Sequence, residues 1–202
     1  SAKAMHRLTS AFQRAFVDRN ATLGDPAFVT MPVDRMASKD YARELRAGIS
    51  EDRASSSKAL TPVARESTET TNYVVVDRWG NAVATTTTIN SLYGSGVWVP
   101  GAGFFLNNEM DDFAAQPGTP NQFGLVQGES NAVAPGKRML SAMAPTIVLD
   151  PKGAVLMIVG GRGGPRIITA VVQAIVNVID YGMPLADAVG APRIHHQALP
   201  DL

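Results

Sequence analysis

The sequence predicts an α+β fold, with helices near both ends of the chain and β-hairpins between them. Three observations lead to this prediction. Apolar residues recur at helical spacing near the N-terminus, two central segments alternate in the manner of paired strands, and a long apolar helix follows the second of these segments. The chain has 202 residues, of which 45% are hydrophobic, so it can bury the core of one large domain.

The first part of the chain is predicted to be helical. Apolar side chains three or four residues apart indicate an amphipathic helix over residues 2–18 and a shorter one over residues 38–49. We treat residues 1–50 as one region. Residues 51–69 are mostly small and polar, which is typical of a linker, and the remaining region, 70–202, carries the predicted strands.

Strand and helix patterns alternate with turns through this last region. β-Branched residues predict one hairpin whose turn contains Gly80 and a second hairpin that turns at Gly153. An apolar helix then follows a glycine-rich turn and ends before Pro184. The predicted elements are strands at 72–76, 82–89, 104–106, 145–149 and 154–159, and helices at 166–181 and 185–189.

Composition excludes several classes of function. The formal net charge is zero and no block of basic residues is present, so nucleic acid is not expected as a partner. No apolar run reaches the roughly 18 residues that a membrane span requires, and no signal peptide opens the chain. The sequence has no cysteine, which excludes disulfides, thiolate metal sites and a cysteine nucleophile.

A threonine pair opens the first predicted strand and has the features of a masked nucleophile. Cleavage of the Glu69–Thr70 bond would give Thr70 a free α-amine beside its hydroxyl, which is a recognised activated arrangement. The plainer alternative is that Thr70 and Thr71 simply enter a strand, where threonine is common. Period-two geometry also puts Thr88 and Asn90 on one polar face of the returning strand.

The turn Gly163-Gly164-Pro165 precedes the long apolar helix. Proline suits the first helical position, and backbone N–H groups at a helix N-terminus attract anions. In an acyl transfer such donors could stabilise a developing oxyanion. The alternative is an ordinary strand-to-helix turn that needs positive φ at its glycines.

Three acidic residues and one serine are further candidates. Glu109, Asp111 and Asp112 could bind a substrate ammonium group or a hard cation, but their spacing fits no EF-hand, and a solvated loop end is the alternative. Ser141 could hold a carboxylate or simply occupy a turn. The adjacent histidines that begin at His195 point in different directions and make a poor metal pair. We predict neither a metal site nor a cofactor site.

Many short motifs with characteristic spacing occur between about residue 68 and the end of the chain. They are Thr70-Thr71-x-Tyr73, Gly80-Asn81-Ala82-Val83, Thr88-Ile89-Asn90, Asn107-Asn108-Glu109-Met110-Asp111-Asp112-Phe113, Pro135-Gly136-Lys137-Arg138, Leu140-Ser141, Met143-x-Pro145-Thr146, Gly163-Gly164 and Ala191-Pro192-Arg193. Together these motifs resemble the small subunit of the γ-glutamyltranspeptidases. Residues 1–50 resemble the C-terminal end of that family's large subunit.

The resemblance implies a fold, a maturation step and an active site. The family has the αββα sandwich of the N-terminal-nucleophile hydrolases, and this chain would form that sandwich incompletely. Its members cleave their own precursor, and here the cut would fall between Glu69 and Thr70. By resemblance, Thr70 is the nucleophile, Thr88 orients it, and Gly163 and Gly164 form the oxyanion hole.

The resemblance also implies how the substrate is held. Asn90, Glu109 and Asp112 match residues that bind the α-amino group of a γ-glutamyl substrate. Ser141 matches a residue that helps to hold the α-carboxylate. The position after it, usually a second serine, is Ala142 in this chain, which removes one carboxylate contact.

Two further positions compare with the family as follows. Residues 117–127 match its lid loop, in which Phe123 takes an aromatic position that is tyrosine in some members. Asn72 replaces the histidine that usually follows the two threonines, a difference that bears on processing and leaves the nucleophile unchanged.

The implied activity is transfer of γ-glutamyl groups from glutathione and other γ-glutamyl amides to water, amino acids or peptides, without a cofactor. Two alternatives stay open. One is a related acylase of the cephalosporin or glutaryl type, which shares the nucleophile and oxyanion hole but needs no ammonium site. The other is an inactive truncated precursor fragment that acts only as a structural or binding module.

The extent of the resemblance also suggests partners and a location. Because the chain starts without methionine in a helical pattern, we expect a longer protein whose targeting signal lies upstream. The missing large-subunit portion is then the expected partner, and exposed sheet edges would favour homo-oligomers. Bacterial family members are usually periplasmic or secreted, and the resemblance implies the same location here.

Overall fold

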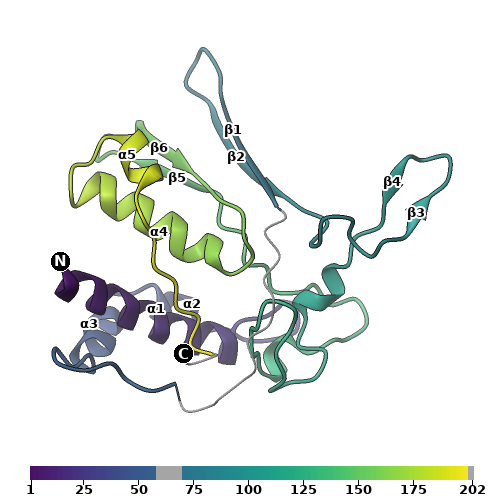
Figure 1. Ribbon diagram of the computed structural model, residues 1–202, viewed down its shortest axis with the longest axis horizontal. Coiled ribbons are helices and arrows are strands. Elements are labelled where there is room, and N and C mark those ends of the chain that lie inside the picture. Colours follow the sequence, from purple (N-terminus) through teal and green to yellow (C-terminus); the bar gives the residue numbers. More distant parts are fainter. Residues whose placement is uncertain (58–69, 200–202) are drawn as a thin grey trace. The chain divides into compact units, whose positions relative to one another are not determined.

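The computed structural model describes residues 1–57 and 70–199 and confirms the predicted α+β class (Figure 1). Two compact units are present. Among the described residues, the first unit contains residues 1–57, 110–141 and 194–199, and the second contains residues 70–109 and 142–193. Most of the predicted linker, and Glu69 of the predicted cleavage site, lie outside the described residues.

The first unit begins with the helix α1 (Ala2–Thr22), which extends past its predicted end at residue 18. The Ser1 hydroxyl caps the helix by accepting a hydrogen bond from the Ala4 N–H at 3.4 Å. Phe12 and Phe16 lie on the buried face, as the helical spacing predicted. The same face also buries the polar residues Ser10, Gln13, Arg19 and Asn20.

Two shorter helices follow, α2 (Val33–Met36) and α3 (Lys39–Ala47), of which only α3 was predicted. Ser38 caps α3, because its hydroxyl accepts from the Tyr41 N–H at 3.1 Å. The Tyr41 hydroxyl donates to the Asp18 carboxylate at 2.8 Å and so joins α3 to α1. Two 3₁₀ turns follow later in the described chain: η1 (Glu109–Asp112), which begins at the last residue of a second-unit segment, and η2 (Glu129–Asn131) of the first unit.

The segment that contains η2 lies against the C-terminal end of α1. The Gly128 N–H donates to the Asn20 carbonyl at 2.9 Å. The Ser130 hydroxyl donates to the carbonyls of Ala21 and Leu23, at 3.2 and 3.0 Å. Gly24 permits this close approach, since a Cβ at that position would collide with the Ser130 carbonyl.

A buried carboxylate fixes a second connection within the same unit. The Asp25 side chain is 1% exposed and accepts from the Arg138 backbone N–H at 2.8 Å, from its Nε at 3.1 Å and from its Nη2 at 2.7 Å. The Ala27 N–H donates to the same carboxylate at 3.0 Å. These bonds, chiefly those from the Arg138 side chain and backbone, hold the pKa of Asp25 well below its ordinary value.

The second unit contains three separate two-stranded antiparallel ladders. The first joins β1 (Thr71–Val76) to β2 (Ala82–Thr87), with Thr71 opposite Thr87. The others join β3 (Trp98–Val99) to β4 (Phe104–Phe105), and β5 (Thr146–Leu149) to β6 (Val155–Val159). Strands were predicted at all these places except β3, which falls in a glycine-rich stretch.

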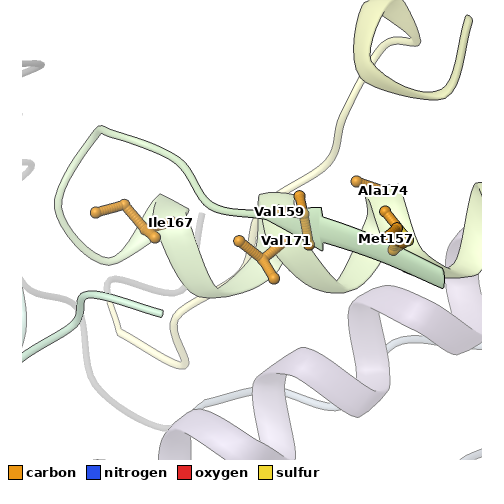
Figure 2. Close-up of a cluster of buried hydrophobic side chains, with 5 residues drawn as sticks. All are labelled: Met157, Val159, Ile167, Val171 and Ala174. Atoms are coloured by element: carbon orange, nitrogen blue, oxygen red, sulfur yellow. The ribbon is translucent and has the colours of Figure 1, made fainter. Parts of the chain in front are cut away.

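The core of the second unit lies between β6 and the helix α4 (Arg166–Ile179), and the helix α5 (Leu185–Gly190) follows α4. Figure 2 shows β6 running along α4, with the clustered side chains contributed by these two elements. They are Met157, Val159, Ile167, Val171 and Ala174. The opposite side of α4 is more open, and Val172 and Ile179 are exposed there.

Within the described part of the chain, no helix combines the length and the apolar character needed to cross a lipid bilayer.

Ile167→Ala should lower the free energy of unfolding by about 2–5 kcal/mol, because it removes buried methyl groups and leaves a cavity beside β6. Ile167 is 1% exposed, whereas Ile179, on the same helix, is 50% exposed. Ile179→Ala is therefore the matched control and should cost less than about 1 kcal/mol. Equilibrium urea unfolding measures both, and equal losses would contradict the assigned core.

Asp25→Asn should destabilise the protein in a way that depends on pH. Since folding lowers the pKa of Asp25, its charge stabilises the native state fully above its unfolded pKa of about 3.9 and progressively less as pH falls below that value. The stability difference between wild type and Asp25→Asn should therefore be largest near pH 7 and shrink toward pH 3.

Urea unfolding at pH 7, 4 and 3 tests this dependence. Asp52→Asn, which changes an exposed carboxylate in the same unit, provides the control. A stability difference for Asp25→Asn that stays constant over this pH range would mean that the ion pair with Arg138 does not contribute through its charge.

Candidate active site

The register of the β1–β2 hairpin brings two candidate hydroxyl groups together. Thr71 pairs with Thr87 at the open end of the ladder, so Thr70 lies opposite Thr88. The Thr70 hydroxyl donates a hydrogen bond to Thr88 Oγ1 at 3.3 Å. Thr70 is half-buried. A hydroxyl that can act as a nucleophile is thus adjacent to a second hydroxyl that can orient it.

Asn90 supports this hydroxyl pair from the end of β2. Its backbone N–H donates to Thr88 Oγ1 at 2.9 Å, and its side-chain amide donates to the Asn108 carbonyl at 3.1 Å. Asn90 is buried and has a φ of 75°, in the left-handed region that asparagine tolerates better than most residues. Its conformation therefore fixes both the Thr88 oxygen and the segment that contains Asn108.

The residues before Glu109 are bonded to the same end of the hairpin. The Asn108 N–H donates to the Ile89 carbonyl at 3.3 Å. The side chain of Asn108 accepts from the Ser91 N–H and donates to the Ser91 hydroxyl, both at 3.0 Å. The Glu109 N–H in turn donates to Asn107 Oδ1 at 2.9 Å. Glu109 thus follows directly on a segment that is bonded to residues 89–91, just after β2.

Asn72 bonds across the hairpin. Its side-chain amide donates to the Thr85 carbonyl and to Thr86 Oγ1, both at 2.9 Å. Any Cβ at Gly160 would collide with this side chain. The chain that leads into the Gly163-Gly164 turn therefore packs closely on β1.

Gly163 and Gly164 form a turn that only glycine adopts easily, with φ values of 115° and 54°. Pro165 follows as the N-cap of α4. The carbonyls of the two glycines accept the first bonds of the helix, from Arg166 and Ile167 at 3.1 Å each. The geometry meets both expectations for this turn, since it needs positive φ and it puts two backbone amides at a helix N-terminus.

Asp112 and Ser141, the other substrate-binding candidates, belong to the first unit and lie near a buried arginine. Arg19 is 7% exposed and donates to the Ser141 carbonyl at 3.2 Å and to Asn20 Oδ1 at 3.0 Å. Burial lowers the pKa of its guanidinium to about 10, and the nearby Asp112 carboxylate acts in the opposite direction. A positive charge is thus retained beside both candidates.

A fully buried asparagine connects the same two candidates through the backbone. Asn131 donates from Nδ2 to the Asp112 carbonyl at 2.8 Å and accepts at Oδ1 from the Leu140 N–H at 3.0 Å. The Gln127 side chain also donates to the Asp112 carbonyl, at 3.1 Å. Neither Arg19 nor Asn131 was predicted as a site residue from the sequence.

Phe123, the predicted lid aromatic, is buried in the first unit. Its N–H donates to Asn121 Oδ1, and its carbonyl accepts from the Gln197 amide, both at 3.0 Å. Gln197 in turn accepts from or donates to the His195 ring at 2.8 Å. The segment predicted as a lid is therefore held by side-chain to backbone bonds.

Asp111 differs from the neighbouring acids. Its carboxylate accepts from the Gln122 N–H at 3.1 Å, and burial raises its pKa. Across residues 1–57 and 70–199, no three histidine or acidic side chains gather closely enough to bind a metal ion.

The candidate residues thus fall into two sets. Thr70, Thr88, Asn90 and Glu109 belong to the second unit, where hydrogen bonds connect the first three, and Gly163 and Gly164 belong to the same unit. Asp112, Phe123 and Ser141 belong to the first unit, where buried side chains hold Asp112 and Ser141.

Comparison with known proteins identifies the family. The family model for gamma-glutamyltranspeptidase matches residues 1–202. The glutathione hydrolase proenzymes of Pseudomonas sp. (strain A14) and Escherichia coli (strain K12) are 47% and 48% identical to this chain, and each alignment covers 100% of the chain. Acylase ACY 1 proenzyme of Pseudomonas sp. (strain SE83) is 41% identical over 96% of the chain and 33% of its own length.

A solved structure gives the same result. The crystal structure of a threonine-to-alanine mutant of Helicobacter pylori gamma-glutamyltranspeptidase matches with a TM-score of 0.63 and 59% identity, covering 65% of this chain and 70% of that chain. The similarity confirms the predicted N-terminal-nucleophile hydrolase fold class.

The alignments cover the whole of this chain but only part of the length of each relative. The chain spans about a third of the length of the two glutathione hydrolase proenzymes, 35% in each case. Because the family model matches every residue and the identity approaches one half, the assignment does not depend on single motifs. The chain belongs to the γ-glutamyltranspeptidase family.

Proposed function

We propose that this chain carries the nucleophile of a γ-glutamyl hydrolase and transferase that acts on glutathione and other γ-glutamyl amides. The observation that carries the proposal is the Thr70–Thr88 hydroxyl pair, 3.3 Å apart at the start of the chain's first strand. Self-cleavage at Glu69–Thr70 would convert Thr70 into an N-terminal threonine with its own amine as base. The 48% identity to a glutathione hydrolase proenzyme supports the choice of substrate.

The chemistry is an acyl transfer in two steps. The Thr70 Oγ attacks the γ-carbonyl of the donor while the α-amine of Thr70 accepts the hydroxyl proton, directly or through water. The oxyanion of the tetrahedral intermediate accepts hydrogen bonds from the Gly163 and Gly164 N–H groups. The intermediate collapses to a γ-glutamyl ester of Thr70, and the leaving amine takes the proton. Water or an acceptor amine then attacks the ester and restores the threonine.

To select a γ-glutamyl group, the site must contact both charged groups on its α-carbon, the α-ammonium and the α-carboxylate. We propose that Asn90, Glu109 and Asp112 bind the α-ammonium group and that Ser141 binds the α-carboxylate. Ala142, next to Ser141, has no hydroxyl to offer a second bond. The positive charge of buried Arg19, which donates to the Ser141 carbonyl, supports a carboxylate at this place.

An acylase is the second candidate function, because Acylase ACY 1 proenzyme is 41% identical to this chain. An acylase for glutaryl-type side chains would use the same nucleophile without an ammonium group on the donor. The acidic residues Glu109 and Asp112 favour a γ-glutamyl donor. Their carboxylates would attract its ammonium group, whereas a glutaryl donor offers only a carboxylate, which they would repel. Parallel assays with γ-glutamyl and glutaryl anilides distinguish the two.

The size difference from the relatives suggests a partner. We propose that a large-subunit portion completes the substrate site and that the mature protein resides in the periplasm or outside the cell, as its family implies. Cell fractionation followed by detection of this chain tests the location. Recovery only from the cytoplasmic fraction would contradict it.

Thr70→Ala should abolish self-cleavage and lower turnover by about 10³-fold or more, because both need the same hydroxyl. Intact mass, N-terminal sequencing and hydrolysis of a γ-glutamyl anilide measure the two effects. Thr71→Ala, at the exposed neighbouring threonine, is the matched control and should cleave and turn over normally. An active, cleaved Thr70→Ala protein would disprove the nucleophile assignment, and an uncleaved wild type would favour the inactive precursor.

Asp112→Asn should raise the KM for γ-glutamyl donors about tenfold or more while changing kcat less, because a charged hydrogen bond to the substrate ammonium is replaced by a neutral one. Asp111→Asn is the control, since the Asp111 carboxylate accepts from the Gln122 N–H within its own loop. Steady-state kinetics at fixed pH measure both variants. An unchanged KM for Asp112→Asn would exclude Asp112 from the ammonium site.

A further inference from the structure

Asn131 is the most completely buried polar side chain among the described residues, with 0% exposure. Its amide group makes three hydrogen bonds. Nδ2 donates to the Asp112 carbonyl at 2.8 Å and to Gln127 Oε1 at 2.9 Å, and Oδ1 accepts from the Leu140 N–H at 3.0 Å. One side chain therefore connects the backbone carbonyl of Asp112 with the backbone N–H of Leu140, the residue before Ser141.

These bonds are costly to lose. A buried backbone carbonyl or N–H that loses its partner destabilises the fold by more than the bond itself contributes, because the group keeps its desolvation penalty without a partner. The Asp112 carbonyl depends on two buried side chains, Asn131 and Gln127, which are also bonded to each other. A linked and satisfied network of this kind permits one arrangement of the connected segments.

A second buried side chain spans the same two positions. Arg19, on α1, donates to the Ser141 carbonyl at 3.2 Å, and its guanidinium interacts electrostatically with the Asp112 carboxylate. Arg19 thus contacts Ser141 from α1, while Asn131 holds Asp112 and the neighbouring Leu140 from η2. The separation of the two candidates is set from two sides.

We propose that Asn131 is a positioning residue that fixes the separation of Asp112 and Ser141, and thereby selects donors that carry an α-ammonium and an α-carboxylate on one carbon. The proposal rests on the proposed function, in which these two residues bind those two groups. Both groups are attached to the same atom, so their binding partners must be held at one spacing, and a shift of about 1 Å can cost 10²-fold in rate.

The test is Asn131→Asp in the intact natural polypeptide. Aspartate has the same shape and can still accept from Leu140, but it has no amide N–H₂ group. As a carboxylate it donates to neither the Asp112 carbonyl nor Gln127 Oε1, and as a neutral acid it donates to only one of them. The readout is competitive inhibition of γ-glutamyl anilide hydrolysis by L-glutamate and by glutarate. Glutarate lacks only the α-ammonium group, so its binding does not depend on the spacing between Asp112 and Ser141.

The inhibition constant of L-glutamate should rise about tenfold or more in Asn131→Asp, while that of glutarate changes by less than about twofold. KM for the γ-glutamyl donor should rise more than kcat falls, since the Thr70–Thr88 pair is held by its own hairpin. A general loss of packing would weaken the binding of L-glutamate and glutarate alike, so it would not change the ratio of their inhibition constants.

Ser130→Ala is the matched control in the same 3₁₀ turn. It removes one hydrogen bond to Ala21 of α1 and one to Leu23 just after the helix, but none to Asp112 or Leu140, so the ratio of inhibition constants should stay at the wild-type value. Where Asn131→Asp does not fold, Asn131→Ser gives the same test, because the shorter side chain cannot bond the Asp112 carbonyl and the Leu140 N–H at the same time.

The outcomes separate the two proposals. An active wild type with an unchanged ratio of inhibition constants in Asn131→Asp, or in Asn131→Ser, would overturn the positioning role and leave the proposed function standing. A cleaved wild type that neither hydrolyses γ-glutamyl anilides nor binds L-glutamate would overturn the proposed function, and the positioning role with it.

Discussion

The first unit depends on a buried carboxylate that joins distant parts of the chain. Asp25 and Arg138 are 113 positions apart in sequence, yet the Asp25 carboxylate accepts from both the backbone and the side chain of Arg138. A buried charge is tolerated only when it is paired and hydrogen-bonded, so the two segments cannot separate without exposing an unpaired ion. Arg138 lies only a few residues before Ser141, and this pair therefore also anchors the proposed carboxylate site.

Local patterns predicted most of the regular elements. The hairpin of β1 and β2 follows from β-branched residues on both sides of a turn, where Asp77 Oδ1 accepts from two backbone N–H groups at 2.9 Å. The period-two pattern predicted that Thr88 and Asn90 share a face, whereas the adjacency of Thr70 and Thr88 follows from the hairpin's register. Gly163 and Gly164 were predicted at a helix N-terminus for a similarly local reason.

The residues that hold the substrate-binding candidates could not be found in this way. Asn131 lies in an irregular segment without periodicity, and its three bonds connect residues that only tertiary structure brings together. The strand β3 was missed because flanking glycines obscure its two residues. Arg19 did leave a signal, since it lies on the same helical face as Phe12 and Phe16. A charge on an apolar face indicates a buried partner.

The connections within the first unit also bear on how the chain is made. Arg19 and its partner Ser141 are 122 positions apart, and the Phe16 ring packs edge-on against His195, near the end of the sequence. Contacts between residues so far apart in sequence form late, and a fold with many of them folds slowly. At about 5–20 residues per second, a ribosome needs on the order of 10 s to reach Ser141 after Arg19. During that time the buried face of α1 remains without these partners, which makes the nascent helix a substrate for chaperones that shield apolar segments.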